Sequence, residues 1–259
     1  MFINIVRANL FRLRRSPTFW ICLACCVLVP LAPQLLAYLE HIANGTLGDF
    51  TIVVAPNSRG FYGICALFSS IIIADLLSSE HGATRSFICA GYRRAHTYAA
   101  LATLFLISLV SVSLVMAEGI VFSAATGVSI EEASVAAWCY GFAGFVFYTT
   151  AVASLSLMVA ATIPVKTISM CFATLMGLSL PGGSVAWVMD LLANMFPMAA
   201  GLYTLIAQIQ LSWVATALEN PAMLLGNATS ALYPFAVSAG WVGASGLLVK
   251  TVWRRATLG

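Results

Sequence analysis

The chain has 259 residues, of which 61% are hydrophobic and only 8% are charged. Soluble domains carry roughly 25% charged residues, so this composition excludes a water-soluble globular protein and indicates that the chain is solvated by lipid. The formal net charge of +3 does not indicate a nucleic-acid-binding groove, because the basic residues are spread among long apolar stretches.

Eleven of the twelve Lys and Arg residues are gathered into short clusters that apolar stretches separate. The four clusters are Arg7/Arg12/Arg14/Arg15, Arg85/Arg93/Arg94, Lys166, and Lys250/Arg254/Arg255. Only Arg59 lies outside them. Lys and Arg residues that flank membrane spans are retained on the cytoplasmic side. The sequence therefore predicts that both termini are cytoplasmic and that the number of crossings is even.

The chain begins with a segment, residues 1–16, that predicts a short amphipathic helix. Its apolar residues lie mostly on one helical face and its arginines largely on the other, as in helices that lie among lipid headgroups. Pro17 then permits a break between this helix and the first apolar stretch. The apolar stretch that follows is longer than the roughly 7 to 15 residues of a signal-peptide core and has no small-residue cleavage site. We therefore expect it to be retained as the first span, roughly residues 18–38.

Further apolar stretches predict four more spans. The second is expected at about residues 60–77, and the third and fourth at about 97–127 and 133–163. The third and fourth exceed the roughly 20 residues that a helix needs to cross a bilayer, so they should tilt or protrude. A fifth span is expected to begin after Lys166 and to end near Leu180, before a Pro-Gly-Gly stop.

Residues 185–215 are apolar, but counting them as one span gives seven crossings and places the last basic cluster outside. Polar and helix-breaking residues interrupt them: Asp190, Asn194, Pro197, Gly201, Gln208 and Gln210. We therefore expect an extracellular re-entrant helical pair here, before a last span at about 231–252. The expected fold is an all-α integral membrane protein in which residues 1–259 form a single domain of six transmembrane helices.

The cytoplasmic loop of residues 78–96 carries the main functional signal. Ser79 can cap a short helix in which Glu80 suits the positive end of the helix dipole, and Gly91 can end that helix. Its side chains offer a partner both apolar and basic contacts, from Phe87, Ile88, Tyr92, Arg85, Arg93 and Arg94. Charge patterning alone also fits arginines that only set the topology.

The loop reads Glu-x-Gly-x-x-Arg and then Gly-x-Arg-Arg. Together with an N-terminal amphipathic helix and six spans, it resembles the membrane subunits of type-2 ABC exporters, especially the small bacterial permeases that export drugs, antimicrobial peptides and sodium. The residues that carry the resemblance are Glu80, Gly82, Thr84, Arg85, Gly91, Arg93 and Arg94. The resemblance implies that the loop is a coupling helix seated on an ATPase subunit. It also implies a second membrane subunit, identical or paralogous, in a bacterial plasma membrane.

No phosphate-binding loop is evident, because neither Lys166 nor Lys250 has a neighbouring glycine. We therefore expect a non-catalytic subunit without a cofactor, with ATP and Mg²⁺ bound by the partner chain. The seven cysteines and three histidines show no metal-ligand pattern, and Cys in a span acts as a small apolar residue. No metal site is expected.

Two carboxylates are candidate pathway residues: Glu118 in the third apolar stretch and Asp75 near the cytoplasmic end of the second. A carboxylate in hydrocarbon is costly and usually faces a cavity or a partner, although both residues can instead reach the membrane interface. A secondary transporter would use such groups, but no inverted repeat or charged pair across the spans is evident. An integral membrane enzyme would need converging polar residues, and these are scattered.

Overall fold

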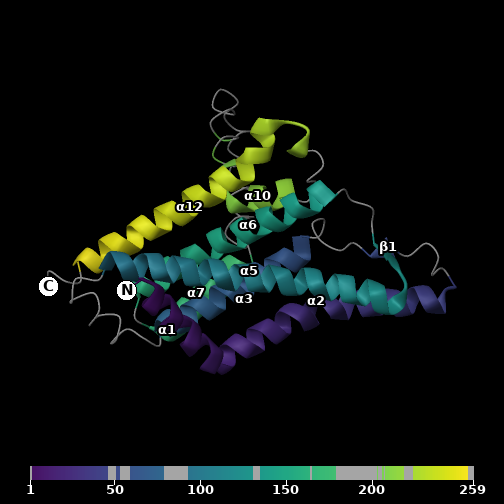
Figure 1. Ribbon diagram of the computed structural model, residues 1–259, viewed down its shortest axis with the longest axis horizontal. Helices are drawn as coiled ribbons and strands as arrows, with labels where there is room; N and C mark the ends of the chain where they lie inside the picture. The colour runs from purple at the N-terminus through teal and green to yellow at the C-terminus, as the bar shows by residue number, and fades with distance from the viewer. Residues whose placement is uncertain are drawn as a thin grey trace.

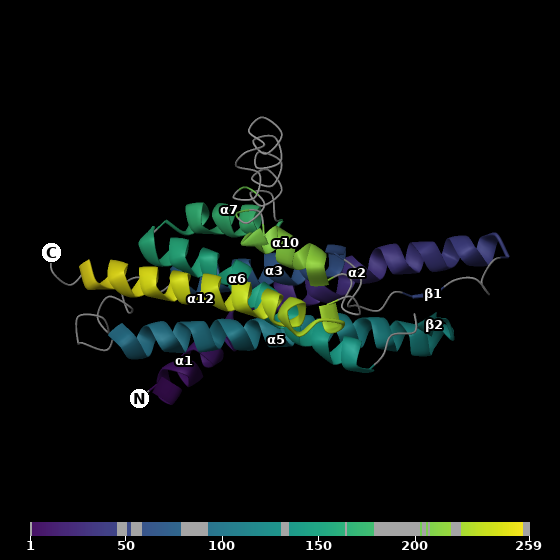
Figure 2. The same ribbon diagram turned by 90° about the horizontal axis from the view of Figure 1, so that it is seen from above.

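The computed structural model describes residues 2–45, 51–52, 59–78, 93–130, 135–163, 165–178, 203, 206, 208–218 and 224–255. Long helices lie side by side in it (Figures 1 and 2). The helices are α1 (Phe2–Arg15), α2 (Pro17–Ala43), α3 (Arg59–Ser78), α5 (Arg93–Thr126), α6 (Val135–Thr162), α7 (Lys166–Gly177), α10 (Leu211–Leu218) and α12 (Ala228–Arg255). Two-residue strands, β1 (Thr51–Ile52) and β2 (Ser129–Ile130), pair in parallel. The predicted all-α architecture is confirmed for this part of the chain.

Four of these helices are long and apolar enough to cross a membrane: Pro17–Ala43, Ala95–Thr126, Val135–Thr162 and Ala228–Trp253. Each has at least 26 residues, whereas a hydrocarbon core of roughly 30 Å needs about 20. α3 contributes a shorter apolar helix, and the 12 residues of α7 extend about 18 Å. The count of six spans stays a prediction. So does the re-entrant pair, since most of residues 185–215 lie outside the described residues.

The predicted break at Pro17 is confirmed. Ser16 has an extended backbone, with φ −78° and ψ 124°, and Pro17 occupies the first position of α2. Proline is favoured there because its fixed φ suits a helix and its missing N–H has no helical acceptor at that position. The result is an elbow between α1 and α2 that turns the first helix away from the long axis of α2 (Figure 1).

Helix α6 lies at the centre of the bundle. In an apolar stretch of 18 residues of α6, 72% of the residues are buried, against 28% in the corresponding stretches of α2 and α12. Its inner faces are rich in small residues, which let neighbouring helices approach closely. Hydroxyl groups also join helices, since Ser154 donates to Ser245 of α12 over 3.1 Å. Small and hydroxyl-bearing residues therefore allow α6 to contact several helices at once.

Helices α3 and α7 meet at Gly177, where the backbones are unusually close. A Cβ atom added at Gly177 would lie 2.3 Å from the Cα of Leu67 and 2.9 Å from its backbone nitrogen. Backbone atoms cannot move aside as a side chain can. By contrast, a Cβ added at Gly63 on α3 would meet nothing within 4 Å.

We therefore expect Gly177→Ala to lower the free energy of unfolding by about 1–3 kcal/mol through overpacking. Gly63→Ala is the matched control and should leave stability unchanged or raise it by up to about 1 kcal/mol, because alanine favours helices. Equilibrium unfolding in mixed detergent micelles measures both variants. Equal stabilities of the two variants would show that α3 and α7 do not pack this closely.

Candidate functional site

The helix ends that carry the basic clusters lie together at one end of the bundle. Helix α5 begins there at Arg93 and α12 ends there at Arg255 (Figures 1 and 2). The rings of His96 and Trp253 join these two helix ends, edge to face, with centroids 5.0 Å apart. This end, which we call the basic end, is the region where the sequence predicts contact with a partner.

Asp75 lies in the last turns of α3 at the basic end, and the structure gives it two partners from distant parts of the chain. One carboxylate oxygen forms an ion pair with Nζ of Lys166, the first residue of α7. The other accepts a hydrogen bond of 3.2 Å from Oγ of Ser16 at the elbow. Asp75 therefore joins the elbow, α3 and α7.

The sequence analysis found no charged pair across the spans, and Asp75–Lys166 corrects that statement. Asp75 is 8% exposed, whereas the Lys166 side chain is half exposed. A carboxylate engaged in this way has a structural role at the helix junction. A role of Asp75 in the pathway stays a prediction.

A double-mutant cycle tests this junction. We expect Lys166→Gln to cost about 1–3 kcal/mol, because it leaves a buried carboxylate without its cation. Adding Asp75→Asn should cost less than the sum of the single effects, with a coupling free energy of roughly 0.5–3 kcal/mol. Lys250→Gln, which removes a charge outside the junction, should change stability by less than about 0.5 kcal/mol. Strictly additive effects would show that the pair does not form.

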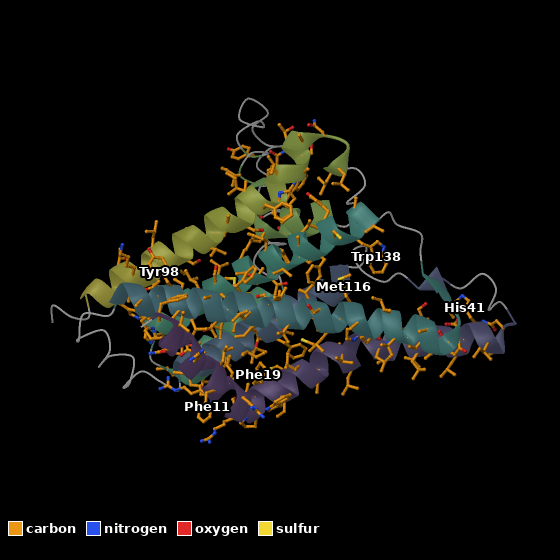
Figure 3. The ribbon with its side chains drawn as sticks, viewed as in Figure 1. Phe11, Phe19, His41, Tyr98, Met116 and Trp138 are labelled. Carbon is orange, nitrogen blue, oxygen red and sulfur yellow. The ribbon has the colours of Figure 1, made fainter. Side chains whose placement is uncertain are left out.

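Glu118 is buried within α5, with 8% of its surface exposed. The side chain of Gln34 on α2 is close enough to interact with the carboxylate, but neither carboxylate oxygen makes a hydrogen bond of ordinary geometry within the described residues. One turn farther along α5, Phe122 packs edge to face on Tyr38. Phe122 and Val128 form a cluster against which Trp138 of α6, labelled in Figure 3, packs. The carboxylate thus lies inside the protein, beside an aromatic cluster.

A buried carboxylate without a partner lowers stability, so we expect Glu118→Gln to leave the free energy of unfolding unchanged or to raise it by up to about 3 kcal/mol. The matched control is Thr103→Val, also buried in α5. Thr103 accepts a 3.2 Å hydrogen bond from Asn9 and donates one of 2.7 Å to the Ala99 carbonyl. In thermal unfolding, Thr103→Val should lose stability, whereas Glu118→Gln should not. A clear loss for Glu118→Gln would assign Glu118 a structural role.

Most of the predicted coupling residues lie outside the described part of the chain: Glu80, Gly82, Thr84, Arg85, Phe87, Ile88 and Gly91. Arg93 and Arg94 form the beginning of α5. The residues on both sides of this segment do lie together, because Leu77 near the end of α3 shares an apolar cluster with Ala100 of α5 and Trp253 of α12. The loop therefore leaves and re-enters the bundle at the basic end.

The first helix docks through a residue that the sequence analysis did not single out. Asn9 of α1 is 3% exposed and donates to Thr103 of α5. Several apolar side chains of α1 remain exposed instead, including Ile3, Leu10 and Phe11. The signal available for this contact was a polar residue, Asn9, on the side of the helix opposite these apolar side chains. Its partner, Thr103, is too distant in the sequence to be inferred.

The described residues hold no group of three or more His, Cys, Asp or Glu side chains placed to bind a metal ion. Cys22, Cys26 and Cys65 are buried in apolar clusters. In these surroundings a cysteine packs as a small apolar side chain.

Together these features define the class of the molecule: a multi-pass helical membrane protein with a basic end and one inward-facing carboxylate in a long helix. No protein-family model matches the chain, and no curated protein or solved structure is significantly similar to it.

Proposed function

We propose that this protein is the transmembrane subunit of an ATP-driven ABC exporter, which forms the substrate pathway and couples to a separate ATPase subunit. The observation that carries the proposal is that α3 ends and α5 begins at the basic end, on the two sides of residues 79–92. The sequence of this loop has the coupling pattern of Glu80, Arg85 and Arg93, and both of its flanking helices end at the basic end. ATP and Mg²⁺ belong to the partner chain in this proposal.

Helix α5 offers a direct mechanical link from the loop to the interior. It is one helix of 34 residues, about 51 Å long, that begins immediately after the loop. Glu118 lies 25 residues beyond Arg93, about 37 Å along the helix axis. Closure of the ATPase pair on ATP would displace the loop and tilt α5, which reorients the surroundings of Glu118. The shift requires that the ATP-bound partner favours one membrane conformation over the other.

A second membrane subunit, identical or paralogous, completes the pathway in this proposal. Helix α12 offers it an open face, because a Cβ atom added at Gly240 or Gly243 would meet nothing within 4 Å. Small residues in a lipid-facing helix allow another helix to approach closely. The proposed arrangement has six spans, both termini in the cytoplasm of a bacterium, and the re-entrant pair on the outer side.

Replacement of Phe87 and Ile88 by Asp tests the coupling role. Two charges buried in the contact should reduce ATPase binding by a free energy of about 3–5 kcal/mol, at least a hundredfold in affinity. The matched control, Phe87→Leu with Ile88→Val, keeps the apolar contact and should bind normally. Binding is measured with the separately purified ATPase, and ATP turnover of the reconstituted complex gives a second readout.

Two further comparisons make this experiment decisive. Phe2→Asp with Val6→Asp in α1 should weaken ATPase binding much less than the loop variant, because α1 is at most a secondary contact. The loop variant must also retain the unfolding behaviour of the native chain, since the loop lies outside the spans. Unchanged ATPase affinity and turnover in a well-folded Phe87→Asp, Ile88→Asp variant would overturn the coupling assignment.

A secondary transporter is the second candidate, and the buried carboxylate of Glu118 is the observation that favours it. Such a protein would purify and function without an ATPase. A stable complex with a nucleotide-hydrolysing subunit, whose turnover depends on this chain, separates the two functions. An integral membrane enzyme lacks comparable support.

A further inference from the structure

A cavity of about 270 Å³ lies at the elbow, where α1, α2 and α5 meet. Its walls include Leu10 and Arg14 of α1, Phe19 and Trp20 of α2, and Leu106 and Val110 of α5. Figure 3 shows Phe11 and Phe19 at this corner of the bundle. The exposed side chains of Leu10, Trp20 and Val110 connect the cavity to the surface of the spans.

Hydrogen bonds hold the shape of this cavity. The indole nitrogen of Trp20 donates to the backbone carbonyl of Arg14 over 2.8 Å, which fixes the elbow angle. Asn9 secures α1 to α5, and Ser16 secures the elbow to Asp75. Three contacts on separate elements therefore form the cavity before any ligand enters.

The chemistry of the walls indicates an elongated apolar ligand with an anionic end. All of the wall residues named above are apolar or aromatic except Arg14. Small-molecule sites usually enclose roughly 300–1,000 Å³, so this cavity suits a section of an acyl chain better than a whole compact ligand. In a bilayer, the acyl chain of a neighbouring phospholipid is the nearest molecule of that shape.

The surrounding charge favours an anionic headgroup. Helix α1 carries Arg7, Arg12, Arg14 and Arg15, and no acidic residue precedes Glu40. Among the described residues, no carboxylate pairs with the guanidinium of Arg14, and Asp75 near the elbow is already paired with Lys166. A guanidinium presents a planar set of donors that matches phosphate oxygens.

We propose that this cavity is a binding site for one anionic phospholipid, with part of an acyl chain between α1, α2 and α5 and the phosphate on Arg14. The site needs only that the chain lies in a bilayer, so it is independent of the exporter proposal. Bound lipid would fasten the elbow and thereby the position of α1 at the basic end.

Trp20 reports directly on occupancy, because brominated acyl chains quench the fluorescence of an indole that they touch. The protein is reconstituted in phosphatidylcholine vesicles that contain either brominated phosphatidylglycerol or brominated phosphatidylcholine at equal mole fraction. The Trp20 signal is the difference between the native chain and Trp20→Phe. We expect stronger quenching by phosphatidylglycerol.

Variants then distinguish a specific lipid site from a general attraction of anionic lipids to the basic helix α1. Arg14→Gln should lower the preference for phosphatidylglycerol about fivefold, the effect of one basic contact near the membrane surface. Arg7→Gln removes the same charge from α1 away from the cavity and should retain most of the preference. Leu106→Phe fills the cavity and should reduce quenching by both lipids.

The proposal is overturned if the two brominated lipids quench Trp20 equally in the native chain. Equal losses for Arg14→Gln and Arg7→Gln would also overturn it, because they indicate attraction to the whole helix. Native mass spectrometry of the same variants, counting retained phosphatidylglycerol, provides a readout that does not depend on Trp20. If Arg14→Gln fails to fold, Leu106→Phe with unchanged quenching and lipid retention overturns the proposal alone.

Discussion

Hydrogen-bonding groups of the backbone must find partners within the chain wherever lipid replaces water, and this constraint underlies the rest of the structure. Each unsatisfied group costs several kcal/mol in hydrocarbon, so a spanning segment is stable only as a helix or a closed barrel. The described chain consists almost entirely of helices, and its two strands are only two residues long. Breaks between helices, such as the elbow at Ser16 and Pro17, fall at the ends of apolar stretches.

The same constraint governs the polar side chains. Threonines within the helices donate to carbonyls of the preceding turn, as Thr150 does to Val146 over 2.7 Å. Other polar side chains join two helices: Ser69 donates a hydrogen bond to Ser111, and Asn9 donates one to Thr103. Several buried side chains among the described residues lack a hydrogen bond, including Ser70, Ser108 and Gln210, and Glu118 is the one among them whose carboxylate has neither oxygen bonded. The cost to stability of a buried carboxylate is the physical reason for the proposal that Glu118 has a functional role.

The basic end concentrates the features that differ from ordinary lipid-facing helices. The Asp75 junction lies there, and the ends of α5 and α12 meet there at His96 and Trp253. The junction links α3, which precedes the proposed coupling loop, to α7 and to the elbow. In the proposed exporter, a partner that displaces the loop would therefore act on several helices at once. The lipid site that we propose at the elbow would place a further ligand next to the same junction.

Local composition was enough to predict the membrane class, the all-α architecture, the amphipathic α1 and the break at Pro17. These properties depend on neighbouring residues, through hydropathy, helical periodicity and the fixed φ of proline. The burial of Glu118 was not predicted, because a carboxylate within an overlong helix can face either the interior or the interface. Its facing partner, Gln34, comes from a different helix.

The sequence by itself therefore determined which segments are helical and apolar, and where basic residues interrupt them. The tertiary structure alone decided which side chains meet: Asp75 with Lys166, Asn9 with Thr103, and Gly177 with the backbone of Leu67. The physical reason is that these contacts depend on the rotation and the relative height of packed helices. Many residue pairs distant in the sequence fit the same apolar pattern, and only the packing of the whole bundle selects among them.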